Sequence, residues 1–189
     1  MSENNLKTEI EALEKELLEK AGKLADLKKQ MPREEVKDYN LTDCEGNSVN
    51  LFSLFGEKDD LIVIHNMGKS CPYCTLWADG FNGMVHHFEN RAGFALVSPD
   101  DHETQKQFAD SRGWKFKMLS AKDSRFTFDL GFQNEEYIMP GFSTFRKENG
   151  KIYRIASSFF GPGDLFCSIW HMVGLLADGA EEWHPQFEY

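Results

Sequence analysis

The chain has 189 residues, of which 41% are hydrophobic and 13% aromatic, a composition typical of globular rather than disordered proteins. Its net charge of −10 argues against nucleic acid as a partner, because phosphate binding needs clustered Lys and Arg. No apolar run reaches the length of a membrane span, and the acidic amino terminus lacks the apolar core of a secretory signal. We therefore expect a cytoplasmic protein with reduced thiols, built as one domain plus an appendage.

Residues 3–31 are predicted to form one amphipathic helix that ends at Pro32. We divide the chain into this helix, residues 1–32, and a domain of residues 33–189. Apolar side chains recur at spacings of three and four along the helix, which makes a heptad seam that is broken at Lys20. Such a seam can pair with a second copy of the chain or lie across the chain's own domain, and we expect the first, a homodimer. The seam consists of Leu6, Ile10, Leu13, Leu17, Leu24, Leu27 and Met31.

Residues 34–54 are predicted as a short strand, a turn and a second short strand, followed by a helical turn at Leu51–Phe55. Cys44 lies beside the turn, between Asp43 and Glu45. Two adjacent carboxylates disfavour a thiolate, so Cys44 is a poor candidate nucleophile.

The candidate chemistry lies in the stretch 61–80, LIVIHNMGKSCPYCTLWADG. Its first four residues are apolar and rich in β-branched side chains, which predicts a buried strand. The motif Cys71-Pro72-Tyr73-Cys74 then opens a helix, since Pro is well tolerated in a first helical turn. Cys71 therefore lies at the helix entrance, where free N–H groups and the helix dipole favour a thiolate, and Cys74 is within reach for a disulfide. A strand, a loop, C-x-x-C and a helix together indicate a redox dithiol.

Two other interpretations of the cysteine pair stay open. A zinc site needs two further ligands, but the sequence holds no second C-x-x-C, and His86 and His87 lie about 18 Å away along the same predicted helix. The two cysteines can also be inert core residues. A lone histidine in a strand, such as His65, is more often a packing residue than a ligand. We favour the redox dithiol and expect no metal and no cofactor.

The rest of the chain alternates strands with helices, which indicates a parallel α/β sheet. A hairpin with Asn149-Gly150 at its turn follows later, and a last helix that begins at residues 161–164 is predicted to contain Cys167 as a structural thiol. The aromatic tail, residues 183–187, is expected to dock on a surface. The predicted elements are a helix to about residue 88, a strand at 92–98, a helix from 100 to about 112, an extended segment at 113–119, and hairpin strands at 142–146 and 151–157.

Several motifs in combination resemble the DUF899 family, a set of thioredoxin-like bacterial proteins with a predicted thiol–disulfide role. The resemblance covers about residues 33–180 and implies an α/β thioredoxin-like fold, a central mixed sheet flanked by helices, here preceded by the amphipathic helix. The motifs are Ile64-His65-Asn66-Met67, Cys71-Pro72-Tyr73-Cys74, Trp77-Ala78-Asp79, Gly113-Trp114 and Met139-Pro140-Gly141.

In a dithiol oxidoreductase one thiolate attacks a disulfide and a second thiol resolves the mixed disulfide. Cys71 fits the first role and Cys74 the second, so these are the candidate catalytic residues. The thioredoxin fold places a cis proline beside the cysteine pair, and Pro140 matches it by position. We therefore predict a cis bond after Met139, whose backbone is then free to pair with an extended substrate. Tyr73, Met139 and Pro140 are the candidate substrate-binding residues.

The favoured function is an intracellular thiol–disulfide oxidoreductase acting on protein or small-molecule thiols and disulfides. A thiol peroxidase is the first alternative. A peroxidatic cysteine normally follows a Thr or Ser by three positions, whereas Gly68 stands three before Cys71. The second alternative is a non-catalytic oligomerising or redox-sensing module in which the amino-terminal helix is the working part.

Overall fold

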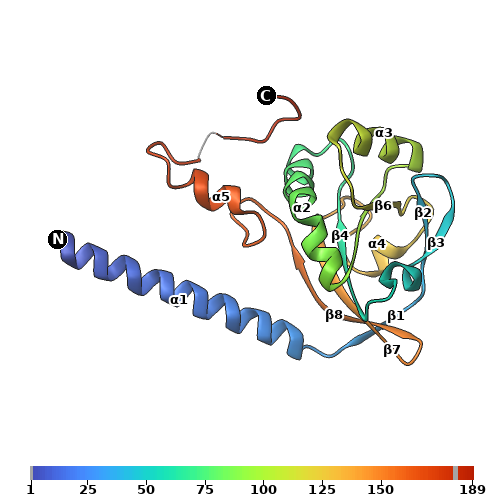
Figure 1. Cartoon of the computed structure of the whole chain (residues 1–189), viewed down its shortest axis with the longest axis horizontal. Helices are drawn as coiled ribbons and strands as arrows, with labels where there is room; N and C mark the ends of the chain where they lie inside the picture. The colour runs from blue at the N-terminus through green and yellow to red at the C-terminus, as the bar shows by residue number, and fades with distance from the viewer. Residues whose placement is uncertain (1, 181–182) are drawn as a thin grey trace.

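The structure is a computed structural model that describes residues 2–180 and 183–189 (Figure 1). Within those residues, one mixed sheet of eight strands has the order β1-β8-β7-β4-β5-β6-β2-β3. Its centre is parallel from β4 through β5 to β6, and β7 runs antiparallel beside β4. The strands are β1 (Glu34–Val36), β2 (Asn40–Asp43), β3 (Ser48–Asn50), β4 (Asp60–His65), β5 (Gly93–Ser98), β6 (Lys117–Ser120), β7 (Gly141–Glu148) and β8 (Lys151–Phe159).

Helices cover both faces of this sheet, because successive side chains of each central strand point to opposite faces. In β4, Leu61 and Val63 pack with η1 and α4 on one face, whereas Ile64 packs with α2, α3 and α5 on the other. The sheet therefore separates two apolar cores. The helices are α1 (Glu3–Gln30), the 3₁₀ helix η1 (Leu51–Phe55), α2 (Pro72–Arg91), α3 (His102–Arg112), α4 (Phe126–Asp129) and α5 (Ser168–Val173).

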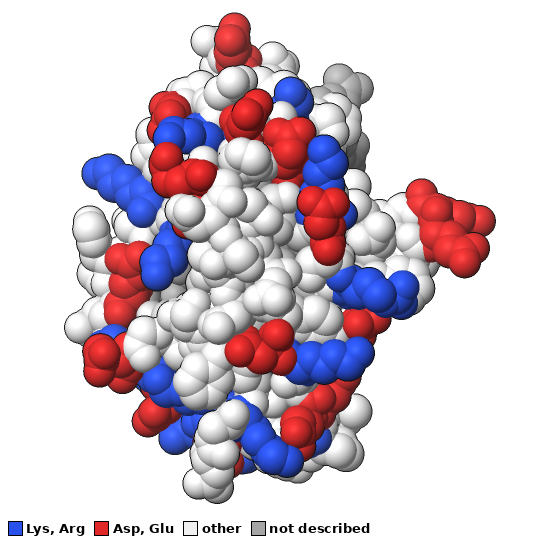
Figure 2. All heavy atoms as spheres, turned by 90° about the vertical axis from the view of Figure 1, so that its right-hand side faces the viewer, with Lys and Arg blue, Asp and Glu red and all other residues white. Residues whose placement is uncertain are grey.

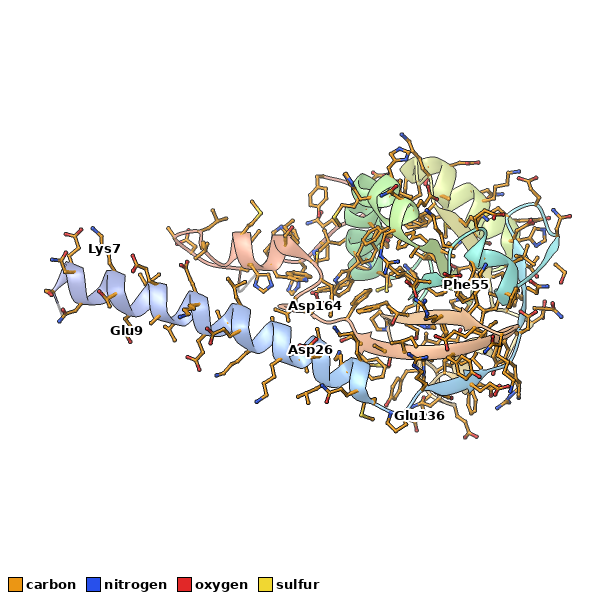
Figure 3. The ribbon with its side chains drawn as sticks, turned by 60° about the horizontal axis from the view of Figure 1, so that its bottom comes forward. Lys7, Glu9, Asp26, Phe55, Glu136 and Asp164 are labelled. Atoms are coloured by element: carbon orange, nitrogen blue, oxygen red, sulfur yellow. The ribbon has the colours of Figure 1, made fainter. Side chains whose placement is uncertain are left out.

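The predicted amino-terminal helix is confirmed as α1, which extends away from the sheet (Figures 1 and 3). Ser2 caps its first turn by accepting a hydrogen bond from the Asn5 N–H. At its other end the Lys28 ammonium donates to the Ser157 carbonyl and the Ser158 hydroxyl of β8. Within α1 no side chain is buried, and the leucines of the seam are 46% to 66% exposed. The seam therefore does not lie across the domain of its own chain.

The last helix differs from the prediction, which began it at residues 161–164 and placed Cys167 inside it. The observed α5 has only six residues, and Cys167 is its amino-terminal cap. The Asp164 carboxylate accepts hydrogen bonds from the N–H groups of Gly161 and Phe166, and Gly163 has a φ of +85°. These contacts make a turn where the apolar pattern had indicated helix.

Charged side chains of both signs are interspersed over the face seen in Figure 2, with an uncharged area at its centre. That face shows no continuous basic stripe of the kind that tracks a nucleic-acid backbone. In the described part of the chain, no helix combines the length and the apolar character that crossing a membrane requires.

Candidate dithiol site

The candidate site is built where β4 ends and α2 begins. Cys71 has an extended backbone, with φ −101° and ψ 104°, and caps α2, whose first residue is Pro72. The Thr75 hydroxyl donates to the Cys71 carbonyl over 3.1 Å, which adds a side-chain bond to the first helical turn. Strand, loop and helix thus place the first cysteine of the motif at the positive end of a 20-residue helix, as the sequence predicted.

Cys71 is a half-buried residue whose sulfur is surrounded by hydrogen-bond donors. The backbone N–H of Cys74 donates to the Cys71 sulfur over 3.2 Å. A hydrogen bond from the Cys74 thiol lowers the pKa of Cys71 most, backbone N–H groups of Cys74 and Tyr73 lower it further, and burial opposes them. The result is a pKa of about 6, so Cys71 is mainly a thiolate at neutral pH.

Cys74 has the opposite character. It is buried, with 2% of its surface exposed, and the Met67 N–H lies 3.5 Å from its sulfur. Its hydrogen bond to Cys71, its burial and the negative charge of Cys71 all raise the pKa of Cys74. All four cysteines of the chain are free thiols in the structure. The pair therefore combines an accessible thiolate with a buried thiol that keeps its proton.

The loop between β4 and α2 is held by two polar side chains to which the sequence analysis assigned no role. Asn66 accepts a hydrogen bond from the Gly68 N–H over 2.7 Å, and Asp100 accepts one from the Lys69 N–H over 2.8 Å. Asp100 follows β5, and the carboxyl ends of β4 and β5 meet at one edge because the strands are parallel. The expected parallel pairing of these strands was the signal in the sequence that could have placed Asp100 near the loop.

Gly68, the residue three positions before Cys71, has no room for a side chain. Its φ is +103°, in the region that favours glycine, and a Cβ atom placed on it would lie 2.9 Å from the Asp100 carboxylate. A peroxidatic site normally has a Thr or Ser at this position. Here the backbone conformation, and not only the residue type, disfavours such a side chain.

Tyr73, a candidate substrate-binding residue, contacts the carboxy-terminal part of the chain. Its hydroxyl is hydrogen-bonded to His184 Nδ1 over 2.7 Å, and its ring stacks on Trp170 with centroids 5.9 Å apart. The expectation that the aromatic tail docks on a surface is confirmed. The aromatic composition of the tail had indicated docking, but no signal in the sequence identified Tyr73 as the contact.

The predicted cis bond between Met139 and Pro140 is wrong, because this peptide bond is trans. The trans isomer is favoured in X-Pro bonds generally, and here the chain runs on directly into β7. The Met139 N–H is also not free for a substrate, since it donates to the Phe132 carbonyl over 2.7 Å. The strand that follows Pro140 lies antiparallel beside β4, and Gly141 pairs with His65 at the end of β4.

The remaining histidine and cysteine candidates lie apart from this chemistry. His65 is buried, its Nε2 lies 2.9 Å from the Ser143 hydroxyl, and its ring stacks on Phe132. Burial lowers the pKa of His65 to about 3, so it is a neutral packing residue. Burial raises the pKa values of the Cys44 and Cys167 thiols, and at Cys44 the neighbouring carboxylates add to the effect. Among residues 2–180 and 183–189, no group of three or more His, Cys, Asp and Glu side chains is placed to hold a metal ion.

Comparison with known proteins identifies one family and a set of structures of similar fold. The model of the DUF899 family, described as "Bacterial protein of unknown function", matches residues 4–188. None of the curated proteins matches the chain.

Three of the similar structures illustrate the likeness. Peroxidoxin BcpB from Mycobacterium tuberculosis has a TM-score of 0.57 at 20% identity, with 67% of this chain and 84% of that chain covered. A PrxQ mutant from Xylella fastidiosa has a TM-score of 0.61 at 13% identity, with coverage of 75% and 91%. The bacterioferritin comigratory protein of Xanthomonas campestris has a TM-score of 0.55 at 17% identity, with coverage of 71% and 86%. At these identities the likeness concerns the fold alone, and it confirms the predicted α/β thioredoxin-like fold.

Proposed function

The chain belongs to the DUF899 family, and on that premise we propose that it is a thiol–disulfide oxidoreductase working through Cys71 and Cys74. One observation supports this most strongly, the asymmetry of the pair. Cys71 has a pKa of about 6 at the helix entrance, whereas Cys74 is buried and its pKa is raised. Thiol–disulfide exchange needs one accessible thiolate that attacks and a second thiol that stays protonated until it resolves the mixed disulfide. Inert core cysteines have no reason to differ in pKa and exposure as these two do.

The reaction begins when the Cys71 thiolate attacks one sulfur of a substrate disulfide. A bond forms between Cys71 and that sulfur, the substrate S–S bond breaks, and the other substrate sulfur leaves as a thiolate. Tyr73, Met139 and Pro140 are the proposed contacts for the substrate. The pairing of Gly141 with His65 supports the last two, since it brings their segment to the edge where β4 ends.

The second step releases the substrate. Once the Cys71 sulfur is bonded to substrate, it no longer carries a negative charge. The hydrogen bond to the Cys71 thiolate, which is the largest cause of the raised pKa of Cys74, is then lost, and so is the repulsion by the Cys71 charge. Cys74 then loses its proton and attacks the Cys71 sulfur. The substrate leaves as its second thiolate, and the protein keeps the Cys71–Cys74 disulfide, having given two electrons to the substrate. An external thiol reductant, as found in a reducing cytoplasm, returns the protein to the dithiol.

The defining experiment is to trap the mixed disulfide. With Cys74→Ser the first step proceeds and the second does not, so incubation with oxidised glutathione should leave glutathione bound to Cys71. The same treatment of Cys71→Ser should leave Cys74 unmodified, and Cys167→Ser should behave like the unchanged protein. Absence of any adduct at Cys71 would contradict the oxidoreductase assignment and favour the non-catalytic module. Mass spectrometry of the cysteine-containing peptides reads out each case.

A thiol peroxidase is the second candidate, supported by a fold likeness to structures whose titles name a peroxidoxin, PrxQ and alkyl peroxide reduction. In that reaction the Cys71 thiolate attacks the terminal peroxide oxygen, the O–O bond breaks, and the alkoxide takes a proton and leaves as an alcohol, so that Cys71 becomes a sulfenic acid. The Cys74 thiol then attacks the sulfenic sulfur, the disulfide forms and water leaves. Gly68 weighs against it, because a serine or threonine would be strained at its φ of +103° and would crowd the Asp100 carboxylate. Consumption of cumene hydroperoxide in the presence of dithiothreitol, compared with the Cys71→Ser variant, separates the two candidates.

The amino-terminal arm, residues 1–32, is proposed to join two copies of the catalytic domain, residues 33–189. The exposed seam of α1 supports this, because covering leucines that are about half exposed with a second helix removes apolar surface from water and is favourable. Three to four heptads are enough for a coiled-coil contact of this kind.

A further inference from the structure

The carboxy-terminal residues Trp183–Tyr189 return to the first turn of α2. His184 is bonded to the Tyr73 hydroxyl, and Trp183 packs edge-to-face on Trp170 with ring centroids 5.5 Å apart. Trp170 in turn contacts Trp77 of α2, with centroids 6.1 Å apart. The segment therefore packs against a cluster of aromatic rings, and the first of these, Tyr73, is two residues after Cys71.

A second anchor holds the far end of the same segment. The Arg112 guanidinium donates to the Phe187 carbonyl over 2.7 Å, and Phe187 packs edge-to-face on Phe108 of α3. Arg112 is itself held by an ion pair with Asp79 of α2. Pro185, between the two anchors, is buried. The segment is thus tied at one end to the first turn of α2 and at the other end to α3, and in Figure 1 the carboxy terminus lies on the side of the molecule where α2 and α3 are found.

We propose that Trp183–Tyr189 is a specificity-determining wall that keeps bulky disulfides away from Cys71 and admits small ones. Exchange requires the attacked sulfur to reach the thiolate, and a disulfide in a folded protein brings its own backbone along with it. Cys71 is half-buried, and the wall is bonded through His184 to Tyr73, two residues along the same helix start. This inference rests on the proposed oxidoreductase function and names its substrate class, small disulfides such as oxidised glutathione.

The test compares a small and a large reagent of the same chemistry at one sulfur. N-ethylmaleimide and a polyethylene-glycol maleimide are reacted with the reduced protein, and modification of Cys71 is followed by peptide mass spectrometry. Two variants remove the wall: a chain that ends at Glu182, and a full-length chain with Trp183→Ala and His184→Ala. The full-length double variant is the one to measure if the shorter chain does not fold. Met172→Ala, an exposed change on α5 outside the wall, is the matched control.

Loss of the wall should raise the rate with the large maleimide by about fivefold or more, and change the rate with N-ethylmaleimide by less than about twofold. The control should leave both rates unchanged. Equal effects on the two reagents would indicate an altered pKa of Cys71 and would overturn the proposal, as would no effect on either.

Disulfide substrates separate this inference from the function on which it rests. Reduction of insulin should increase in both wall variants, while reduction of oxidised glutathione stays nearly constant. If no variant reduces either disulfide but the maleimide rates still diverge, the oxidoreductase assignment fails and the wall stands. If the unchanged protein reduces insulin as fast as the variants do, the wall fails and the assignment stands.

Discussion

The backbone N–H of Cys74 lies 3.2 Å from the sulfur of Cys71, so the second cysteine of the motif stabilises the first as a thiolate. The Cys74 thiol adds a further hydrogen bond to the same sulfur. In the proposed reaction, Cys74 thus tunes the nucleophile before attack and then displaces the substrate from it. The backbone hydrogen bond depends on the three-residue spacing of the cysteines at the start of α2.

We predict that Cys71 is the cysteine alkylated fastest and that its rate rises with pH through a midpoint of about 6, because only the thiolate reacts. Cys74→Ala removes the largest cause of the lowered pKa, so it should move the midpoint upward by about one pH unit or more. Iodoacetamide rates between pH 4.5 and 9 measure both. Cys167→Ser should leave the midpoint in place, and faster reaction at Cys74 than at Cys71 would reverse the two assigned roles.

We predict that the full chain self-associates through α1. Leu13→Glu combined with Leu17→Glu places charges in the exposed seam and should convert the dimer to monomer, as should a chain that begins at Pro32. Sedimentation velocity measures the mass of each. Glu14→Gln, a change on α1 outside the seam, should stay dimeric, and a monomeric mass for the unchanged chain would rule out this contact.

Two glycine-to-alanine changes should have opposite effects on stability. A Cβ atom at Gly141 would lie 2.3 Å from the Ser158 carbonyl and 2.5 Å from the Phe132 ring, so Gly141→Ala should destabilise the fold by about 1–3 kcal/mol. At Gly80, inside α2, nothing lies within 4 Å, so Gly80→Ala should stabilise by up to about 1 kcal/mol. Urea unfolding measures the free energy of unfolding of both variants. Equal changes in the two would show that the close approach at the start of β7 is not maintained in solution.

We predict that His65 makes stability fall as the solution is acidified. Its pKa is lowered to about 3 in the folded chain from an ordinary value of 6.5, so between these values the unfolded chain binds more protons. Stability from this group is complete above pH 6.5 and is lost as the pH falls toward 3, reaching a loss of about 2 kcal/mol at pH 5.

Urea unfolding at pH 7.5 and pH 5 tests this against His65→Phe. The variant leaves the Ser143 hydroxyl without its partner and should be less stable at pH 7.5, by about 1–3 kcal/mol. Its stability should nevertheless change less between the two pH values than that of the unchanged chain. A parallel decline in both proteins would assign the acid sensitivity to other groups.

Much of the architecture was predictable because it depends on local patterns. The apolar run 61–64 is short and rich in β-branched residues, and the seam of α1 has a helical period, so each pattern predicts one kind of element. The structure has the strand and the helix at these places. Cys71 was placed correctly at a helix entrance because the tolerance for Pro72 in a first turn is itself local.

The failures arose where tertiary contacts decide. The isomer before Pro140 was inferred from a topological match, but the bond is trans, the isomer that X-Pro bonds favour generally. The apolar stripe after Gly161 resembled a long helix, yet Asp164 caps a turn there. The contact between Tyr73 and His184 joins positions 111 residues apart, and nothing in either local sequence encodes it.

The tight packing at Gly68 also limits how such a protein can change during evolution. A single nucleotide converts a glycine codon to serine, but the new side chain would meet the Asp100 carboxylate and a backbone suited to glycine. Replacing Asp100 first would make room at the cost of the bond to the Lys69 N–H that fixes the loop. We expect either change alone to disturb the loop, so a hydroxyl at position 68 would require a change at Asp100 as well. Gly68 and Asp100 are therefore expected to be epistatically coupled.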